Sequence, residues 1–164
     1  MYPAHAVCRS PEHGTRRVPD TFVATPMYQT ILVTLDTTPT DRAIIEHIKR
    51  LAKCLGSRVV LLHVAVGAAA KWLGADAGGE EVDKSQAYLN RVKAEFEAAG
   101  VPAATELAYG EPAREIIRWV EANGCDLVAM STHGHRWLGD LFYGTTASDV
   151  QHRLSVPVLL LRAK

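Results

Sequence analysis

The sequence has few of the features that mark a secreted, membrane-spanning or nucleic-acid-binding protein. Its three cysteines are too few and too far apart for a disulfide-stapled fold. No apolar run reaches the roughly 18 residues that a membrane span needs. Eighteen basic residues balance eighteen acidic ones, so no broad basic surface for nucleic acid or anionic lipid is expected. We therefore expect a cytoplasmic protein whose partners are small molecules or other proteins.

The length and the apolar content indicate one folded domain. A chain of 164 residues with 48% hydrophobic residues can bury a sizeable core. The first 26 residues carry four of the eight prolines and show neither helical nor strand periodicity. This composition predicts a disordered extension over residues 1–26, followed by the folded domain at 27–164.

Strand-like and helix-like segments alternate from residue 30 onward. Apolar or alternating runs predict strands at 30–35, 58–66, 103–109, 126–130 and 156–162. Helical patterns lie between consecutive strands, and this βαβ alternation predicts an α/β fold with a parallel sheet.

Punctuating residues mark the predicted helix ends. Thr38 is a candidate N-cap and Pro39 a candidate first residue of the helix that Gly56 ends. The helix that follows strand 103–109 is predicted to begin at Glu111-Pro112 and to end at Gly124. The last helix is predicted over about 144–154.

Two loops are best equipped to bind a ligand. In such sheets the ligand lies beyond the carboxyl ends of the strands, where the winding direction reverses. The first loop follows Asp36 and the second follows Ser131. Gly134 allows a ligand close to the main chain, and Gly144 to Thr146 stand where a helix begins, so free N–H groups there favour phosphate. The alternative is that each glycine permits a turn and the threonine caps the helix.

Two familiar phosphate motifs come close to this loop and fail. Gly139 to Thr146 resembles a P-loop, but it lacks the lysine and follows its strand only after a long excursion. Thr132 to His135 reads T-H-G-H, which resembles the T/H-x-G-H signature of nucleotidylyltransferases. That signature follows the first strand in those enzymes and the fourth strand here, so such catalysis stays an alternative.

The arrangement resembles the universal stress proteins more closely, over residues 28–163. ATP-binding members of that family carry G-x2-G-x9-G-S/T after the fourth strand. Gly134, Gly144 and Thr145 occupy the last three motif positions, and Ser131 replaces the first glycine. Further resemblances lie at Asp36 and in segments 61–64, 110–116 and 155–162. The resemblance implies a doubly wound five-stranded parallel sheet in the order 3-2-1-4-5, with helices on both faces.

The resemblance also implies a site for ATP, with Mg²⁺ carried by the phosphates. Asp36 and Val64 would contact adenine, with the Thr34 backbone nearby and Met130 under the base. These four residues form the predicted base pocket.

The predicted phosphate-binding residues follow the fourth strand. Ser131 and Gly134 would lie against the ribose and the first phosphate. Gly144, Thr145 and Thr146 would hold the phosphate chain through backbone N–H and hydroxyl groups. His135 is a candidate phosphate neighbour, whereas His63 is interpreted as a strand-end or core histidine.

No nucleophile, base and orienting group converge in the sequence, and the phosphate loop has no lysine. We therefore predict a regulatory, stress-response domain that binds ATP. Two alternatives stay open: a nucleotide-free stress or scaffold homodimer, and a slow ATPase or nucleotidyl-transfer enzyme. No protein-built metal site is predicted at the H-x-H pair formed by His133 and His135.

The last predicted strand, 156–162, is strongly apolar and would lie at the edge of the sheet. An unpaired apolar edge invites aggregation. We predict a homodimer through this strand, as the resemblance also implies, and neither a nucleic-acid nor a membrane partner.

Overall fold

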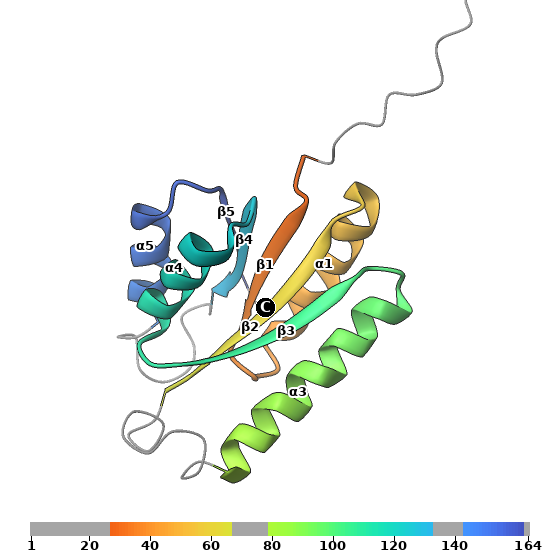
Figure 1. Ribbon diagram of the computed structural model, residues 1–164. Coiled ribbons are helices and arrows are strands. Elements are labelled where there is room, and N and C mark those ends of the chain that lie inside the picture. Colours follow the sequence, from red (N-terminus) through yellow and green to blue (C-terminus); the bar gives the residue numbers. More distant parts are fainter. Residues whose placement is uncertain (1–26, 67–78, 133–142, 163–164) are drawn as a thin grey trace, which may run out of the picture.

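The computed structural model describes residues 27–66, 79–132 and 143–162 (Figure 1). The predicted disorder of residues 1–26 lies outside these ranges. Five parallel strands form one sheet in the order β3-β2-β1-β4-β5, which confirms the predicted order. The strands are β1 (Thr30–Leu35), β2 (Arg58–Ala65), β3 (Ala103–Tyr109), β4 (Leu127–Thr132) and β5 (Val158–Arg162).

Helices cover both faces of the sheet, as predicted. They are α1 (Asp41–Leu55), α3 (Gly79–Ala98), α4 (Pro112–Asn123) and α5 (Tyr143–Arg153). Figure 1 shows α1 and α3 on one side of the sheet and α4 and α5 on the other. Each face has its own buried core, because the strands between them point apolar side chains in both directions.

The central strand β1 shows why this sequence forms a doubly covered sheet. Ile31 and Val33 belong to the core under α1 and α3, and Leu32 belongs to the core under α4 and α5. All three are fully buried. A continuous β-branched and apolar run suits a strand that neither face exposes to water.

The first helix begins later than predicted. Thr40, not Thr38, is the N-cap residue of α1, and Pro39 precedes the helix. The Thr38 hydroxyl donates instead to Asp36 within the preceding turn, so it does not cap the helix. The predicted end is confirmed, since Gly56 adopts the left-handed conformation with φ 69°.

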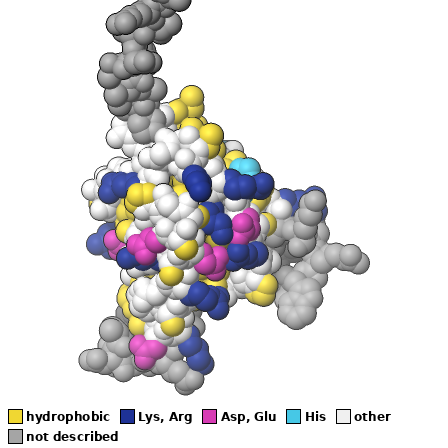
Figure 2. Space-filling model, turned by 90° about the vertical axis from the view of Figure 1, so that its right-hand side faces the viewer, with side chains coloured by type: hydrophobic (Ala, Val, Ile, Leu, Met, Phe, Trp, Pro, Cys, Tyr) yellow, Lys and Arg dark blue, Asp and Glu magenta, His cyan; other side chains and the backbone are white. Residues whose placement is uncertain are grey.

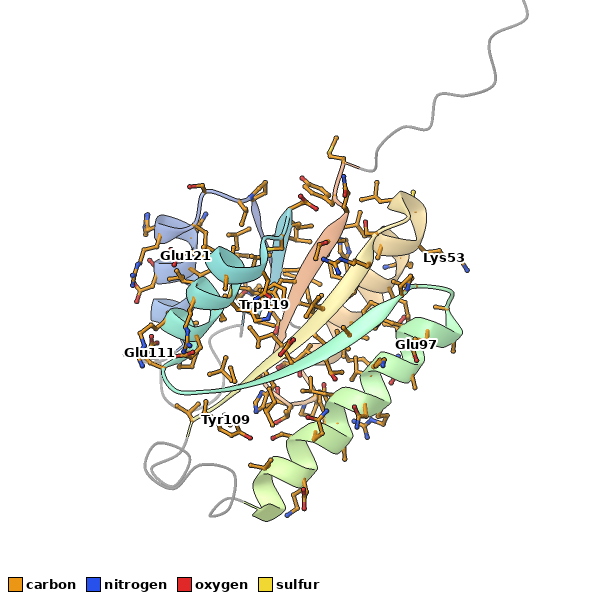
Figure 3. All side chains as sticks on the ribbon, viewed as in Figure 1. Lys53, Glu97, Tyr109, Glu111, Trp119 and Glu121 are labelled. Carbon is orange, nitrogen blue, oxygen red and sulfur yellow. The ribbon has the colours of Figure 1, made fainter. Side chains whose placement is uncertain are left out.

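The predicted start of α4 is confirmed. The Glu111 carboxylate accepts hydrogen bonds from the backbone N–H groups of Ala113 and Arg114, and Pro112 occupies the first turn. Figure 3 labels Glu111 at this end of α4, close to Tyr109 at the end of β3. The connection is therefore short, and α4 begins at the carboxyl edge of the sheet.

A carboxylate ties the amino ends of the two central strands together. Asp126, just before β4, accepts hydrogen bonds from the N–H groups of Gln29 and Thr30, both at 2.8 Å. This contact lies at the edge of the sheet opposite the carboxyl ends of β1 and β4, where Asp36 follows β1 and Ser131 lies near the end of β4.

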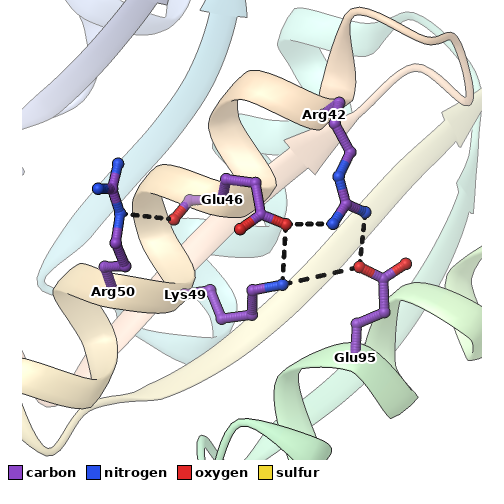
Figure 4. Close-up of polar contacts among 5 residues, drawn as sticks. All are labelled: Arg42, Glu46, Lys49, Arg50 and Glu95. Carbon is purple, nitrogen blue, oxygen red and sulfur yellow. Dashed lines mark hydrogen bonds and ion pairs between the residues drawn. The ribbon is translucent and has the colours of Figure 1, made fainter.

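Charged side chains join α1 and α3 at the surface. Arg42 and Lys49 of α1 both approach Glu95 of α3, and Glu46 completes the network (Figure 4). Figure 2 shows basic and acidic side chains interspersed on the face it presents. Such exposed pairs contribute little to stability individually, because water and salt screen them.

The two sides of α3 should therefore differ sharply in their effect on stability. Phe96 is fully buried in the core, and Phe96→Ala should lower the free energy of unfolding by about 3 to 5 kcal/mol. Its neighbour Glu95 faces Arg42, and Glu95→Ala should cost less than about 1 kcal/mol. Urea denaturation of both variants checks this; equal losses would contradict the assignment of the core.

Candidate functional site

A cleft of about 780 Å³ lies at the carboxyl edge of the sheet. The ends of β1, β2 and β4 form its floor, and residues of α3, α4 and α5 form its walls. The chain leaves β1 for β2 on one side, whereas β4 and β5 lie on the other. The cleft thus stands at the point where the winding direction reverses, the usual place for a ligand in this architecture.

Six of the ten residues predicted to bind a nucleotide line this one cleft. They are Thr34, Asp36, Val64, Met130, Ser131 and Thr146. Gly134 and His135 lie outside the described residues. Gly144 and Thr145 belong to the first turn of α5, where only the backbone is described. The structure brings the predicted residues together, while their role in binding stays a prediction.

An apolar patch forms the deep part of the cleft. Val64 and Met130 are buried and belong, with Ile116 of α4, to the core between the sheet and the helices α4 and α5. A flat apolar group placed here would lose contact with water on binding. This part of the cleft therefore suits an aromatic ring.

Hydroxyl groups stand beside the apolar patch. Thr34 and Ser131 are half-buried at the ends of neighbouring strands, and Thr146 is buried in α5. The N-terminal turn of a helix carries N–H groups without intrahelical partners. Thr146 places that end of α5 at the cleft, so an anionic group has donors available there.

Asp36 shapes the turn after β1 and also lines the cleft. Its Oδ1 accepts hydrogen bonds from the Thr38 N–H at 3.0 Å and from the Thr38 hydroxyl at 2.6 Å. The Asp36 side chain thus helps to form the turn. The turn leaves the carboxylate at the cleft wall, so turn formation and the predicted contact with adenine are compatible.

His63 fits its predicted role as a strand-end histidine. Its Nδ1 lies 2.8 Å from the carbonyl oxygen of Leu35, which can only accept, so Nδ1 carries the hydrogen. The bond ties the ends of β1 and β2 together beside the cleft.

Asp41, which was not predicted as a site residue, supports the cleft from behind. This residue opens α1, has no exposed surface and accepts hydrogen bonds from the N–H groups of Asp36 and Thr37. Asp41 precedes the buried Ile44 and Ile48 by three and seven residues, the spacing of one helix face. A carboxylate on the apolar stripe was the available signal.

The wall formed by α3 was missed as well. Lys84, Tyr88 and Arg91 follow one another at spacings of four and three residues, so they share a helix face, and all three line the cleft. The Arg91 guanidinium lies 5.1 Å from the centre of the Tyr88 ring. This wall brings two cationic side chains to a cleft that also holds the Asp36 carboxylate.

Burial perturbs the acidic groups behind the cleft. It raises the pKa of Asp41 from 3.8 to about 7, and the neighbouring charge of Asp36 acts in the same direction, while the hydrogen bond from Tyr88 opposes it. Burial and the bond to Asp41 also raise the pKa of the Tyr88 phenol. Tyr88 therefore keeps its proton and remains a donor to Asp41, at 2.8 Å.

The rest of the described chain lacks two other kinds of functional feature. Among those residues, no three His, Cys, Asp or Glu side chains gather as a metal would need. No helix among them is long and apolar enough to cross a membrane. Burial raises the pKa of Cys125 to about 11, so this thiol stays protonated and a poor nucleophile.

The fold and the cleft define a doubly wound α/β domain with a cleft at its topological switch point. The chain belongs to the universal stress protein family, whose profile matches residues 27–162.

Relatives of the chain include one protein from Methanocaldococcus jannaschii and one from Synechocystis. Universal stress protein MJ0577 of Methanocaldococcus jannaschii is 24% identical over 84% of this chain and 97% of its own length. Universal stress protein Slr1230 of Synechocystis is 36% identical, but the match spans 51% of this chain and 30% of that protein.

Solved structures of family members share the fold. The structure of MJ0577 superimposes with a TM-score of 0.72, covering 84% of this chain and 98% of that one. A universal stress protein in complex with cAMP gives 0.69 at 17% identity, covering 84% and 99%. One from Archaeoglobus fulgidus in complex with dAMP gives 0.62 at 16% identity, covering 82% and 98%.

The buried carboxyl of Asp41 should make stability depend on pH. Since its pKa is raised on folding, the native state holds this proton more tightly than the unfolded chain, and stability from this group falls as the pH rises from about 4 to about 7. Asp41→Asn carries no such proton. The free energy of unfolding of the wild type should therefore fall relative to Asp41→Asn across that range.

Urea denaturation at several pH values between 4 and 8 measures this difference. Asp149→Asn, which changes an exposed carboxylate on α5, is the matched control and should show no comparable trend. If the difference in free energy of unfolding between wild type and Asp41→Asn stays constant with pH, the Asp41 carboxyl is ionised in the folded protein over this whole range.

Proposed function

We propose that this chain is a regulatory, stress-response domain that binds ATP in the cleft at the carboxyl edge of the sheet. The observation that carries the proposal is that six residues assigned to base, ribose and phosphate from the sequence line a single cleft. Those residues come from three strands, the turn after β1 and a helix, which are far apart along the chain.

The size and the chemistry of the cleft support a nucleotide. Its volume of about 780 Å³ falls within the usual range for small-molecule sites. Val64 and Met130 suit a base, the hydroxyls suit a ribose, and the end of α5 at Thr146 suits a phosphate. Two family members of the same fold have been solved with adenine nucleotides, dAMP and cAMP.

The subtype with the ATP-binding glycine motif is part of this proposal. Ser131 takes the place of the first motif glycine, is half-buried and lines the cleft. Its hydroxyl can donate to a ribose or phosphate oxygen, which offsets the loss of backbone freedom. Mg²⁺ would be brought by the phosphates rather than held by protein carboxylates.

Binding without rapid turnover is the activity that the residues favour. The phosphate loop carries no lysine to meet charge that develops during phosphoryl transfer. The test below separates this proposal from two alternatives. One is a slow ATPase or nucleotidyl-transfer activity through His135, and the other is a nucleotide-free scaffold.

Asp36→Ala should weaken ATP binding about ten- to a hundredfold, because a hydrogen bond to a charged group contributes roughly 1 to 3 kcal/mol. Calorimetric titration of ATP with Mg²⁺ into protein stripped of endogenous ligand measures this. Asp149→Ala, which removes an exposed carboxylate outside the cleft, should bind as the wild type does.

The wild-type titration, a titration with GTP and a phosphate-release assay on wild type and His135→Ala decide between the alternatives. No binding by the wild type at millimolar ATP would establish the nucleotide-free reading. Phosphate release with magnesium that disappears in His135→Ala would establish the enzyme. Equal affinity for GTP would contradict adenine recognition by the Asp36 turn.

We also propose that β5 forms a homodimer interface. β5 is an edge strand, and Leu160 on it is 38% exposed, an unusual surface for a large apolar residue on an open edge. Pairing with a second copy would cover this edge.

Leu160→Lys should convert the dimer to monomer or make the protein insoluble, since a charge at the centre of the interface would be desolvated. Light scattering after size exclusion gives the mass. Met27→Lys is the control, because it changes an exposed apolar residue that precedes β1 and lies outside β5. A soluble Leu160→Lys protein with an unchanged mass would place the interface elsewhere.

A further inference from the structure

The turn between β1 and α1 holds a strained residue at the cleft. Thr37 has φ 65°, and among the described residues it is the only one other than glycine with a positive φ. This conformation is unfavourable for a β-branched residue and persists only where the surroundings enforce it. Asp36 and Thr37 both line the cleft, so the strained turn is part of the site.

Asp41 supplies what enforces this turn. Its Oδ1 accepts a hydrogen bond from the Asp36 N–H at 3.2 Å, and its Oδ2 accepts one from the Thr37 N–H at 3.0 Å. Because Asp41 has no exposed surface, water does not compete for these oxygens. The two bonds fix the direction of both peptide groups and so fix where Asp36 points.

Tyr88 connects this arrangement to the opposite wall. Its hydroxyl donates to Asp41 Oδ2 at 2.8 Å, and its ring lies at the cleft under Arg91. The surface ion pairs between Glu95 and α1 join the same two helices further along (Figure 4). Relaxation of the turn would therefore either break its two N–H bonds to Asp41 or move Asp41 away from Tyr88 of α3.

We propose that Asp41 and Tyr88 are positioning residues of the nucleotide cleft, which hold the strained Thr37 turn in the conformation that presents Asp36 to the base. The inference rests on the proposed ATP binding and adds what sets its affinity. Neither residue needs to touch the ligand through its carboxyl or hydroxyl group to act in this way.

Asp41→Asn tests the first half of the proposal. An amide has one acceptor oxygen, so it can receive one of the two N–H groups and turns an NH₂ group toward the other. At a pH above the raised pKa of Asp41, where the wild type carries a carboxylate, ATP affinity measured by calorimetry should fall roughly ten- to a hundredfold. Tyr88→Phe keeps the ring and Asp41, removes one donor, and should lower the affinity roughly three- to tenfold.

Rescue separates positioning from general damage. Glycine adopts positive φ without strain, so Thr37→Gly should make Asp41 dispensable. The double variant Asp41→Asn/Thr37→Gly should bind ATP within roughly threefold of the Thr37→Gly single variant, a non-additive pair as expected for coupled neighbours. Asp41→Asn with the affinity of the wild type, or a double variant no better than Asp41→Asn, would overturn the proposal.

Asp126→Asn is the matched control, because Asp126 also accepts two N–H groups, at the opposite end of β1. Asp126→Asn should lower stability while changing ATP affinity less than roughly twofold. Asp126 contacts the amino end of β1, so its substitution should leave the Thr37 turn at the carboxyl end unchanged. If Asp126→Asn weakens ATP as much as Asp41→Asn does, the effect is loss of stability and the proposal is wrong.

Hydrogen exchange gives a readout that needs no ligand. The amides of Asp36 and Thr37 should exchange slowly in the ligand-free wild type and faster in Asp41→Asn and Tyr88→Phe. A wild type that binds no ATP would refute the proposed function, and the exchange rates would still decide whether Asp41 holds the turn. Unchanged exchange of both amides in Asp41→Asn would refute the positioning role.

Discussion

All five strands of the sheet run in the same direction, and this constraint places everything else in the molecule. Parallel strands need crossovers, so helices must cover both faces, and all strand ends that precede a helix meet at one edge. Between β1 and β4 the chain turns to opposite sides, which leaves a space that no crossover fills. The cleft occupies that space, and the residues of the two central strands line it.

Two residues at and behind the cleft, Thr37 and Asp41, lower the stability of the folded domain. A carboxyl with no exposed surface must lose its hydration, and Thr37 adopts a conformation that costs of order 1 to 2 kcal/mol for an L-residue. Three donors to Asp41 offset part of this loss. Residues chosen for stability alone would place an apolar side chain at position 41 and glycine at position 37. The combination found here is typical of a site whose geometry matters more than its stability.

Periodicity was enough to predict the five strands and their parallel direction, whereas the strand order was predicted from the family resemblance. The apolar runs of β1, β2 and β4 and the alternating run of β3 differ as central and edge strands do, and the helix stripes between them allow only crossover connections. Glu111 and Gly56 marked helix ends correctly because their preferences act through the local backbone. The start of α1 was predicted wrongly because a threonine hydroxyl can either cap a helix or bond within a turn. The Thr38 hydroxyl bonds to Asp36 in the turn.

The sequence could not reveal the contacts that depend on packing between distant elements. Asp41 and Tyr88 lie 47 residues apart, and nothing in either segment indicates that the two side chains meet. The strand-end residues were easier, since parallel topology alone brings Asp36 and Ser131 to one edge. The loop after β4 that carries Gly134 and His135 lies outside the described residues, so their predicted roles stay predictions.

The hydrogen bond that the Thr30 N–H donates to Asp126 joins residues 96 positions apart, and the β1–β4 pairing that it accompanies spans a similar separation. A chain that has folded only its first half has β1, β2 and β3 but no second side to the cleft. Long-range pairing of this kind carries a large loop-closure entropy and tends to form late. A small molecule that contacts both halves would bind only a chain in which the central strands are paired. Its binding energy would therefore oppose the complete unfolding of the domain rather than the fraying of its helices.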